Sequence, residues 1–238
     1  MSNVTNAGYI LVPPRLTPIH SFDLWGPLVN TEILGEERVR LFKKVAEKEQ
    51  LDTEIAARIV AEYRALNRGE PWATGPRKPE IISALEEPLK KYPELVPNYA
   101  AAIYPDGIET LKEIFSAGEK ALIFSTKSSE WVQLHLAPLV GEAEIPLYAG
   151  AKHQPEAFRH VYESELAKGG RLVTHTADEL PELEAAVASG VFSGWRGKTV
   201  FVNRNNTVTR QQAVEAGINF YVSNLEAVNY RGLVVRRR

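Results

Sequence analysis

From about residue 100 onward, short apolar runs alternate with segments of helical spacing, and this alternation limits the fold more than any other feature of the sequence. The run KALIFS at 120–125 is apolar almost throughout, as expected for a strand buried on both faces. Further strands are predicted at 145–148, 172–175, 199–203 and 220–222, with helices at 107–117, 129–139, 155–168, 180–189 and 211–216. The pattern predicts an α/β fold, Rossmann-like, with a parallel sheet and helices on both faces.

The first hundred residues are organised differently. A strand is predicted at 17–25, and the residues after it show helical spacing without a convincing strand. Helices are predicted at 36–50, 53–66 and 80–91, with a loop rich in Pro and Gly at 71–79. We therefore expect residues 1–29 and 101–238 to form the α/β core and residues 30–100 to form a small all-helical insertion.

Composition excludes some classes of site and favours few partners. The chain has 238 residues with 44% hydrophobic content, enough for one core and a small second module. The absence of cysteine excludes disulfides, thiolate metal sites and cysteine nucleophiles. A net charge of -2 gives no argument for a nucleic-acid or membrane partner, and the basic end Arg236–Arg238 is interpreted as a solvated tail. The sequence makes no prediction of oligomeric state.

The start of the sequence lacks a basic region followed by a long apolar stretch, so no signal peptide is predicted. No apolar run approaches the roughly 20 residues that span a bilayer. A cytoplasmic location is expected.

Polar residues follow the predicted strands, where ligands of open parallel sheets bind. They are Asp23, Ser125 and Thr126, Lys152, Asp178, and Arg204 after the first to fifth strands. Two carboxylates can hold Mg²⁺, and a Lys offsets the charge of an anionic group. Hydroxyl and backbone N–H groups bind anionic oxygens, and a carboxylate can act as a nucleophile. The set predicts a site for a small anionic substrate.

The order and spacing of these segments resemble the haloacid dehalogenase-like (HAD) superfamily over most of the chain. FDLWGPL resembles its first motif, ALIFSTKS its second and AKHQPEAF its third. TADELPELEAAVASG resembles its fourth, an acidic loop that leads into a helix. Helical caps inserted after the first motif are common in this superfamily, and residues 30–100 would be such a cap.

The resemblance implies roles for individual residues. Asp23 matches the nucleophile, while Ser125 and Lys152 match the groups that bind the anion and balance charge. Mg²⁺ would be held by Asp23, the backbone carbonyl of Trp25 and Asp178, with Glu182 or Glu179 in a supporting position. We further expect Trp25, Thr126 and Arg204 to contact the substrate.

The first motif departs from the phosphatase pattern at two positions. Phosphatases of the superfamily carry a second Asp two residues after the nucleophile as general acid and base, and here that position is Trp25. The next Thr of the motif is replaced by Pro27. An indole cannot transfer a proton, so the leaving group must depart with little help.

Three interpretations of this departure stay open. In the first, the substrate has a good leaving group, as in 2-haloacid dehalogenases, which have an aromatic residue at this position. Phosphonatases also lack the second Asp and have a small residue there together with a cap Lys, for which Lys43, Lys44 and Lys48 are candidates. A Mg²⁺-dependent phosphatase could use a substitute proton shuttle, with His175 or Glu179 as candidates. A HAD fold without catalysis, serving as a binding protein, is the third.

Overall fold

The computed structural model describes residues 16–125, 129–142, 144–193, 197–206, 208–230 and 234–235. Its main feature is a six-stranded parallel sheet of order β3-β2-β1-β4-β5-β6. The strands are β1 (Thr17–Phe22), β2 (Lys120–Phe124), β3 (Leu147–Tyr148), β4 (Gly170–Ala177), β5 (Lys198–Val202) and β6 (Phe220–Val222). The predicted α/β, Rossmann-like fold is confirmed, and β1 lies in the middle of the sheet between β2 and β4.

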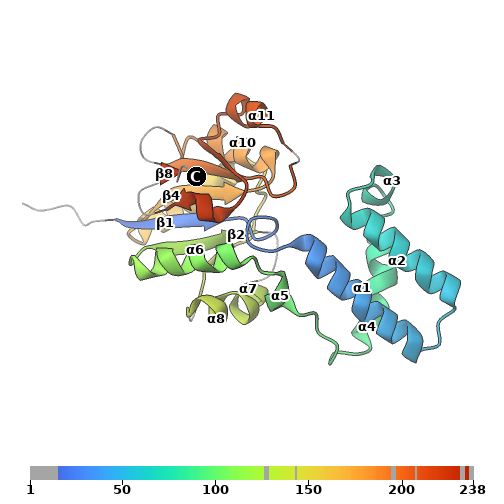
Figure 1. Ribbon diagram of the computed structural model, residues 1–238. Coiled ribbons are helices and arrows are strands. Elements are labelled where there is room, and N and C mark those ends of the chain that lie inside the picture. The colour runs from blue at the N-terminus through green and yellow to red at the C-terminus, as the bar shows by residue number, and fades with distance from the viewer. Residues whose placement is uncertain are drawn as a thin grey trace, which may run out of the picture.

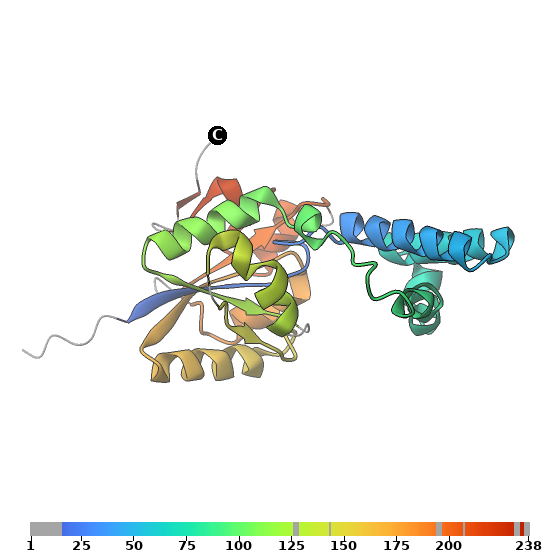
Figure 2. The same cartoon turned by 90° about the horizontal axis from the view of Figure 1, so that it is seen from below.

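Helices cover both faces of the sheet (Figure 2). One face carries α6 (Pro105–Ser116), α7 (Ser129–His135), α8 (Ala137–Val140) and the 3-10 turn η1 (Leu225–Ala227). The other carries α9 (Pro155–Ala167), α10 (Leu180–Ala188) and α11 (Arg210–Glu215). A short helix, α5 (Tyr99–Ala102), precedes α6.

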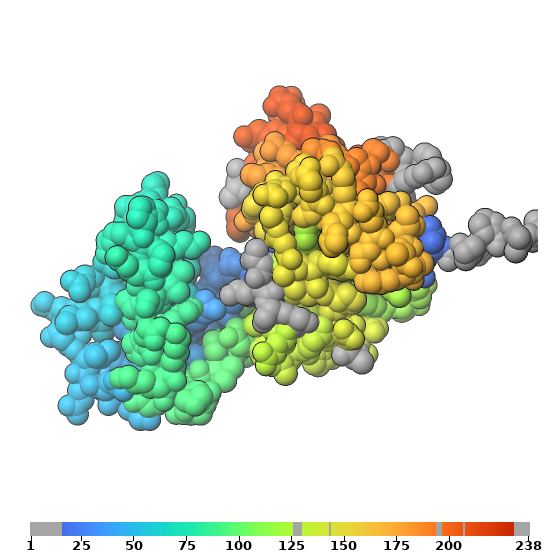
Figure 3. Space-filling model, turned by 180° about the vertical axis from the view of Figure 1, so that it is seen from behind, coloured from blue at the N-terminus to red at the C-terminus, as the bar shows by residue number. Residues whose placement is uncertain are grey.

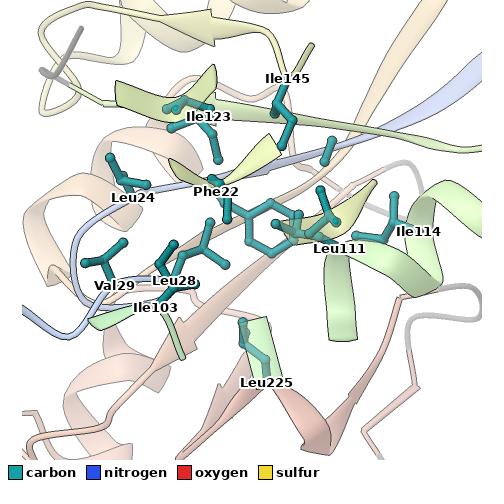
Figure 4. Packing of buried hydrophobic residues seen from close by; sticks show 14 of the residues in the cluster. Phe22, Leu24, Leu28, Val29, Ile103, Leu111, Ile114, Ile123, Ile145 and Leu225 are labelled. Carbon is teal, nitrogen blue, oxygen red and sulfur yellow. The ribbon is translucent and has the colours of Figure 1, made fainter. Parts of the chain in front are cut away.

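The alternation of side chains along β1 divides the core into two clusters. Phe22 packs with Leu111 and Ile114 of α6, as Figure 4 shows, whereas Ile19 packs with Phe158 of α9 on the opposite face. These side chains are almost fully buried, and burial of each is worth about 1.5–3 kcal/mol. Packing on both faces therefore fixes β1, and with it the position of the residue that follows.

Four helices between β1 and α5 form a separate group: α1 (Thr31–Lys48), α2 (Thr53–Asn67), α3 (Pro71–Thr74) and α4 (Lys78–Lys90). They share their own apolar cluster, which includes Phe42, Val60 and Leu85. The side chain of Asn30 caps α1, because its Oδ1 accepts from the backbone N–H groups of Glu32 and Ile33. The group stands to one side of the α/β core (Figures 1 and 3).

Two backbone segments join the helical group to the core and pair with each other. Val29 and Ile103 form an antiparallel bridge, and Asn30 N–H donates to the carbonyl of Ala102 at 2.7 Å. Tyr104 N–H donates to the carbonyl of Leu28 at 2.9 Å. The entry and the exit of the helical group are therefore held together at its base.

Several local features differ from the predictions, among them the short helix α5, which was not predicted. The predicted loop at 71–79 contains the four-residue helix α3, and the predicted helix at 129–139 is divided into α7 and α8 near Pro138, which has no N–H to donate. A short antiparallel pair, β7 (Val228–Asn229) with β8 (Val234–Val235), was not predicted. The tail Arg236–Arg238 lies outside the described residues. Among the described residues, no helix combines the length and the apolar character needed to cross a membrane.

Candidate functional site

Four of the predicted site residues follow neighbouring strands at one edge of the sheet. Asp23 follows β1, Ser125 follows β2, the loop after β3 carries Lys152, and Asp178 follows β4. The carboxyl ends of parallel strands meet at the same edge, so the fold brings these residues to one region. Of the other predicted substrate contacts, Thr126 lies outside the described residues.

Asp23 is buried and makes two polar contacts. Its Oδ2 accepts a hydrogen bond from Lys152 Nζ at 2.6 Å, and its Oδ1 accepts from the backbone N–H of Leu24 at 2.8 Å. Only 1% of the residue is exposed. Burial and the nearby charge of Glu182 together raise the pKa of Asp23 to about 8, although the charge of Lys152 acts in the opposite direction. Additional positive charge at this carboxylate would favour its anionic form.

Lys152 lies between two carboxylates. Its Nζ is 2.7 Å from Glu182 Oε2 as well as 2.6 Å from Asp23 Oδ2, and Glu179 Oε2 is 3.7 Å away. Burial alone would lower the pKa of Lys152, but the charges of Asp23 and Glu182 outweigh it and hold that pKa above its usual value. Lys152 therefore stays protonated and balances the charge of buried carboxylates.

A series of contacts between buried polar side chains fixes the position of Glu182. Glu182 Oε1 is 3.0 Å from His175 Nε2, and His175 Nδ1 is 2.9 Å from Ser21 Oγ. The hydroxyl of Ser21 donates to the carbonyl of Thr174 at 2.8 Å, so both ring nitrogens of His175 face acceptor oxygens. His175 is fully buried against Phe158, with ring centroids 4.8 Å apart. It is connected to Lys152 through Glu182, and sequence reasoning missed this role because it depends on how α10 packs against β4.

Asp178 lies against the backbone of Gly26. Gly26 has φ +89°, and a Cβ placed on it would be 1.9 Å from Asp178 Oδ2. Only glycine combines that backbone conformation with this close approach. Burial and the neighbouring charge of Glu179 together raise the pKa of Asp178 to about 7, although the charge of Lys152 acts in the opposite direction. The glycine of the first motif is thus explained by the acid of the fourth.

Arg204, predicted to contact the substrate, is occupied by protein groups. Its Nη2 donates to the carbonyl of Pro27 at 2.8 Å and to both carboxylate oxygens of Asp106 at 2.9 Å. Its guanidinium carbon lies 3.7 Å from the centre of the Tyr104 ring. Asp106 also accepts from the backbone N–H of Leu225 at 2.8 Å. These contacts tie the loop after β1 to α6 and β5.

Trp25 and Ser125 occupy the side of Asp23 toward β2. The backbone of Trp25 pairs with Val29, and its ring centroid lies 5.3 Å from that of Trp131 in α7. Ser125 is 1% exposed, and its backbone N–H donates to the carbonyl of Tyr148 at 3.1 Å. No proton-transferring side chain therefore stands at position 25, two residues after Asp23.

Solved structures share this fold at low sequence identity. A candidate phosphatase from Clostridium difficile aligns with TM-score 0.55 and 14% identity over 88% of this chain and 95% of its own. A HAD phosphatase from Thermococcus onnurineus aligns with TM-score 0.50 and 18% identity over 88% of this chain and 94% of its own. The chain has the haloacid dehalogenase-like fold.

A candidate HAD hydrolase from Bacillus subtilis, solved with magnesium bound, aligns with the same fold at TM-score 0.50 and 12% identity, over 89% of this chain and 96% of its own. No protein-family model matches the sequence, and no curated protein matches it either. The likeness therefore concerns the fold, and the chemistry has to be argued from the site.

Proposed function

We propose that this protein is a hydrolase that cleaves a small anionic substrate with Asp23 as the nucleophile. The observation that carries the proposal is the buried Asp23 on the cation of Lys152, at a strand end of a HAD-like fold. An oxygen of Asp23 attacks the reacting atom, the leaving group departs with its electron pair, and an ester or acyl phosphate of Asp23 forms. Water then cleaves that intermediate and restores the carboxylate.

Three neighbours support this reaction. Lys152 balances the charge of Asp23 and of the incoming anion, and Ser125 lies at the end of the neighbouring strand, where it can donate to an anionic oxygen. Thr126 is proposed as a further substrate contact. Arg204 is proposed to position the loop after β1 through Asp106 and Pro27, since its polar contacts are made with them.

The donor set fits a magnesium ion. Asp23 and Asp178 are carboxylates with raised pKa values, a condition that a divalent cation relieves, and Gly26 leaves no side chain between the backbone and Asp178. Among the described residues no cluster of three or more His, Cys, Asp or Glu side chains suits a metal, so the carbonyl of Trp25, water and substrate would complete the shell. When bound, Mg²⁺ would neutralise the substrate anion and favour the ionised form of Asp23.

Trp25 restricts the leaving group. Without a general acid at this position, a leaving group that is stable as an anion is required. Activated phosphate or phosphonate compounds and 2-haloacids meet this condition, whereas alkyl phosphates do not. An imine mechanism gains no support, because Lys43, Lys44 and Lys48 are exposed on α1.

We also propose that the helical group within residues 30–100 acts as a cap that excludes water and selects the substrate. Its support is the paired connection at Val29 and Ile103, which places the base of the group next to the loop that carries Trp25.

The test is a screen of activated phosphates, phosphonates and 2-haloacids with wild type and Asp23→Asn side by side, with and without a chelator. We expect turnover by wild type to fall at least about a thousandfold in Asp23→Asn, because the neutral amide is a poor nucleophile. Loss in chelator would support phosphoryl transfer, and metal-independent halide release would support a dehalogenase. Equal turnover by both proteins would refute the nucleophile, and ligand binding without turnover would support a binding protein.

Glu179 supports a second candidate function, a phosphatase with a substitute acid and base. Its carboxylate is half-exposed and lies 3.7 Å from Lys152 Nζ, so it stands at the rim of the same group of charges. In that case Glu179→Gln would abolish turnover of alkyl phosphates while sparing activated esters. If both substrates respond equally, Glu179 has no role in proton transfer.

A further inference from the structure

Four rings form one cluster beside the proposed nucleophile. Trp25 contacts Trp131 with ring centroids 5.3 Å apart, and Tyr99 meets Trp131 edge-on at 5.5 Å. His135 lies 4.3 Å from Tyr99 and 5.2 Å from Trp131. The aromatic cluster therefore consists of Trp25, Tyr99, Trp131 and His135, drawn from the loop after β1, from α5 and from α7.

The aromatic cluster lies on the side of Asp23 opposite to the charged groups. Leu24, which lies between Asp23 and Trp25 in the sequence, is fully buried in the core, whereas Trp25 is partly exposed. Trp25, Tyr99 and Trp131 pack against the core on the sheet face covered by α6 to α8. His175, which supports Glu182, packs against Phe158 of α9 on the opposite face. Asp178, which follows β4, lies against Gly26. A substrate on Asp23 would thus have charges on one side and rings on the other.

The aromatic cluster offers ring faces and one unused donor. Burial lowers the pKa of His135, which favours the neutral form of its ring. Trp131 Nε1 is buried and has no hydrogen-bond acceptor among the described residues. An unpaired buried N–H is costly, and an acceptor atom on a bound ligand would satisfy it.

We propose that the aromatic cluster binds an aromatic leaving group, which makes aryl phosphates the substrate class of this enzyme. The inference rests on the proposed function of Asp23. A phenol has a pKa of about 10, like that of a Tyr side chain, against about 15.7 for water, so phenolate departs without a proton donor. One feature, Trp25, thereby accounts for both the missing acid and the ring contact.

The bonds and electrons balance without a further reactant. An oxygen of Asp23 forms a bond to phosphorus, and the bond from phosphorus to the aryl oxygen breaks with its electron pair on the phenolate. Water attacks the resulting acyl phosphate of Asp23, releases inorganic phosphate and restores the carboxylate. The phenolate takes its proton from solvent after release.

Binding of two phosphonates tests the ring contact apart from turnover. Their carbon–phosphorus bonds carry no leaving oxygen, so wild-type protein can be titrated by calorimetry with phenylphosphonate and with methylphosphonate. Contact between aromatic rings adds to the affinity gained by burying apolar surface, so we expect phenylphosphonate to bind about tenfold more tightly than methylphosphonate. Equal affinities, or no measurable binding of phenylphosphonate, would overturn the proposal.

Variants of Trp131 test whether this residue causes the preference for phenylphosphonate over methylphosphonate. Trp131→Leu should remove most of the tenfold preference, and Trp131→Phe, which keeps a ring, should retain it. Trp72→Leu is the matched control, because Trp72 is 48% exposed on α3 in the helical group. Thermal unfolding of each variant shows whether it is folded, and a preference unchanged in a folded Trp131→Leu contradicts the assignment.

Turnover then separates this inference from the proposed function. Acetyl phosphate has a good leaving group without a ring, so the ratio of kcat/KM for phenyl phosphate to that for acetyl phosphate should fall about tenfold in Trp131→Leu. If Asp23→Asn loses both activities while the ratio is the same in wild type and Trp131→Leu, the proposed function stands and the aromatic site fails. If Asp23→Asn retains both activities, the nucleophile fails, and the phosphonate titration still decides the aromatic site.

Discussion

The two sides of the β1 carboxyl end differ in kind. Toward the sheet face covered by α9 and α10 lie charges that compensate one another: Lys152 between Asp23 and Glu182, with His175 behind them. Toward the face covered by α6 to α8 lie rings, with Trp25 against Trp131. Buried charges need partners at close range, so the charged side has little freedom to vary, whereas rings can be exchanged at smaller cost.

The difference indicates which side selects the reaction partner. The charged side provides what any attack by a carboxylate on an anion requires: a cation beside Asp23 and a second acid, Asp178, placed against Gly26. The aromatic side includes Trp25, at the position where the phosphatase pattern of the first motif has an acid. On our proposal, the charged side performs the attack and the aromatic side restricts what can leave.

The largest effect on stability is expected from Lys152→Met. The variant leaves Asp23 and Glu182 buried with no cation between them, and breaking a buried pair in this way costs about 3–5 kcal/mol. Lys112→Met is the control, because Lys112 pairs with Glu109 on the surface of α6, where ion pairs contribute little. Urea unfolding at pH 7 measures both. Equal losses would mean that Lys152 is not the group that balances the buried charge.

Gly26→Ala should have an intermediate effect. The added Cβ both strains a positive-φ backbone, by about 1–3 kcal/mol, and collides with the Asp178 carboxylate. Gly118→Ala separates the two causes, since Gly118 has φ +73° and open space around its Cβ position. We expect Gly26→Ala to lose at least about 1 kcal/mol more than Gly118→Ala, with turnover reduced only in Gly26→Ala. Identical behaviour of the two variants would rule out a role for the contact with Asp178.

The smallest effect is expected from Trp25→Asp, which places an acid on the aromatic side. A general acid is worth about 10²–10⁴-fold in rate when well placed, and an unoptimised one should raise the ratio of kcat/KM for methyl phosphate to that for phenyl phosphate by about tenfold. Trp25→Asn is the matched control, because the Asn side chain has nearly the same shape as that of Asp but no acidic proton. If Asn raises the ratio as much as Asp does, the change reflects space and not acid catalysis.

The elements of the core could be predicted because they are encoded locally. KALIFS is apolar over its length and forms β2, and the helical spacing of 155–168 corresponds to α9. The short antiparallel pair β7–β8 escaped prediction because two-residue strands carry no periodicity. The helix predicted at 129–139 is split because Pro138 breaks the hydrogen-bond ladder, a cost the apolar pattern does not register.

The parallel sheet and the residues that follow its strands are readable from the amino-acid pattern, because strand pattern and chain order are local properties. The absence of the acid is also readable there, since Trp25 stands in the first motif. The contacts between groups are visible only in the folded protein: Arg204 is held by Asp106, His175 supports Glu182, and Trp25 meets Trp131. Such contacts join segments up to about a hundred residues apart, and their geometry follows from strand register and helix packing, which no local pattern specifies.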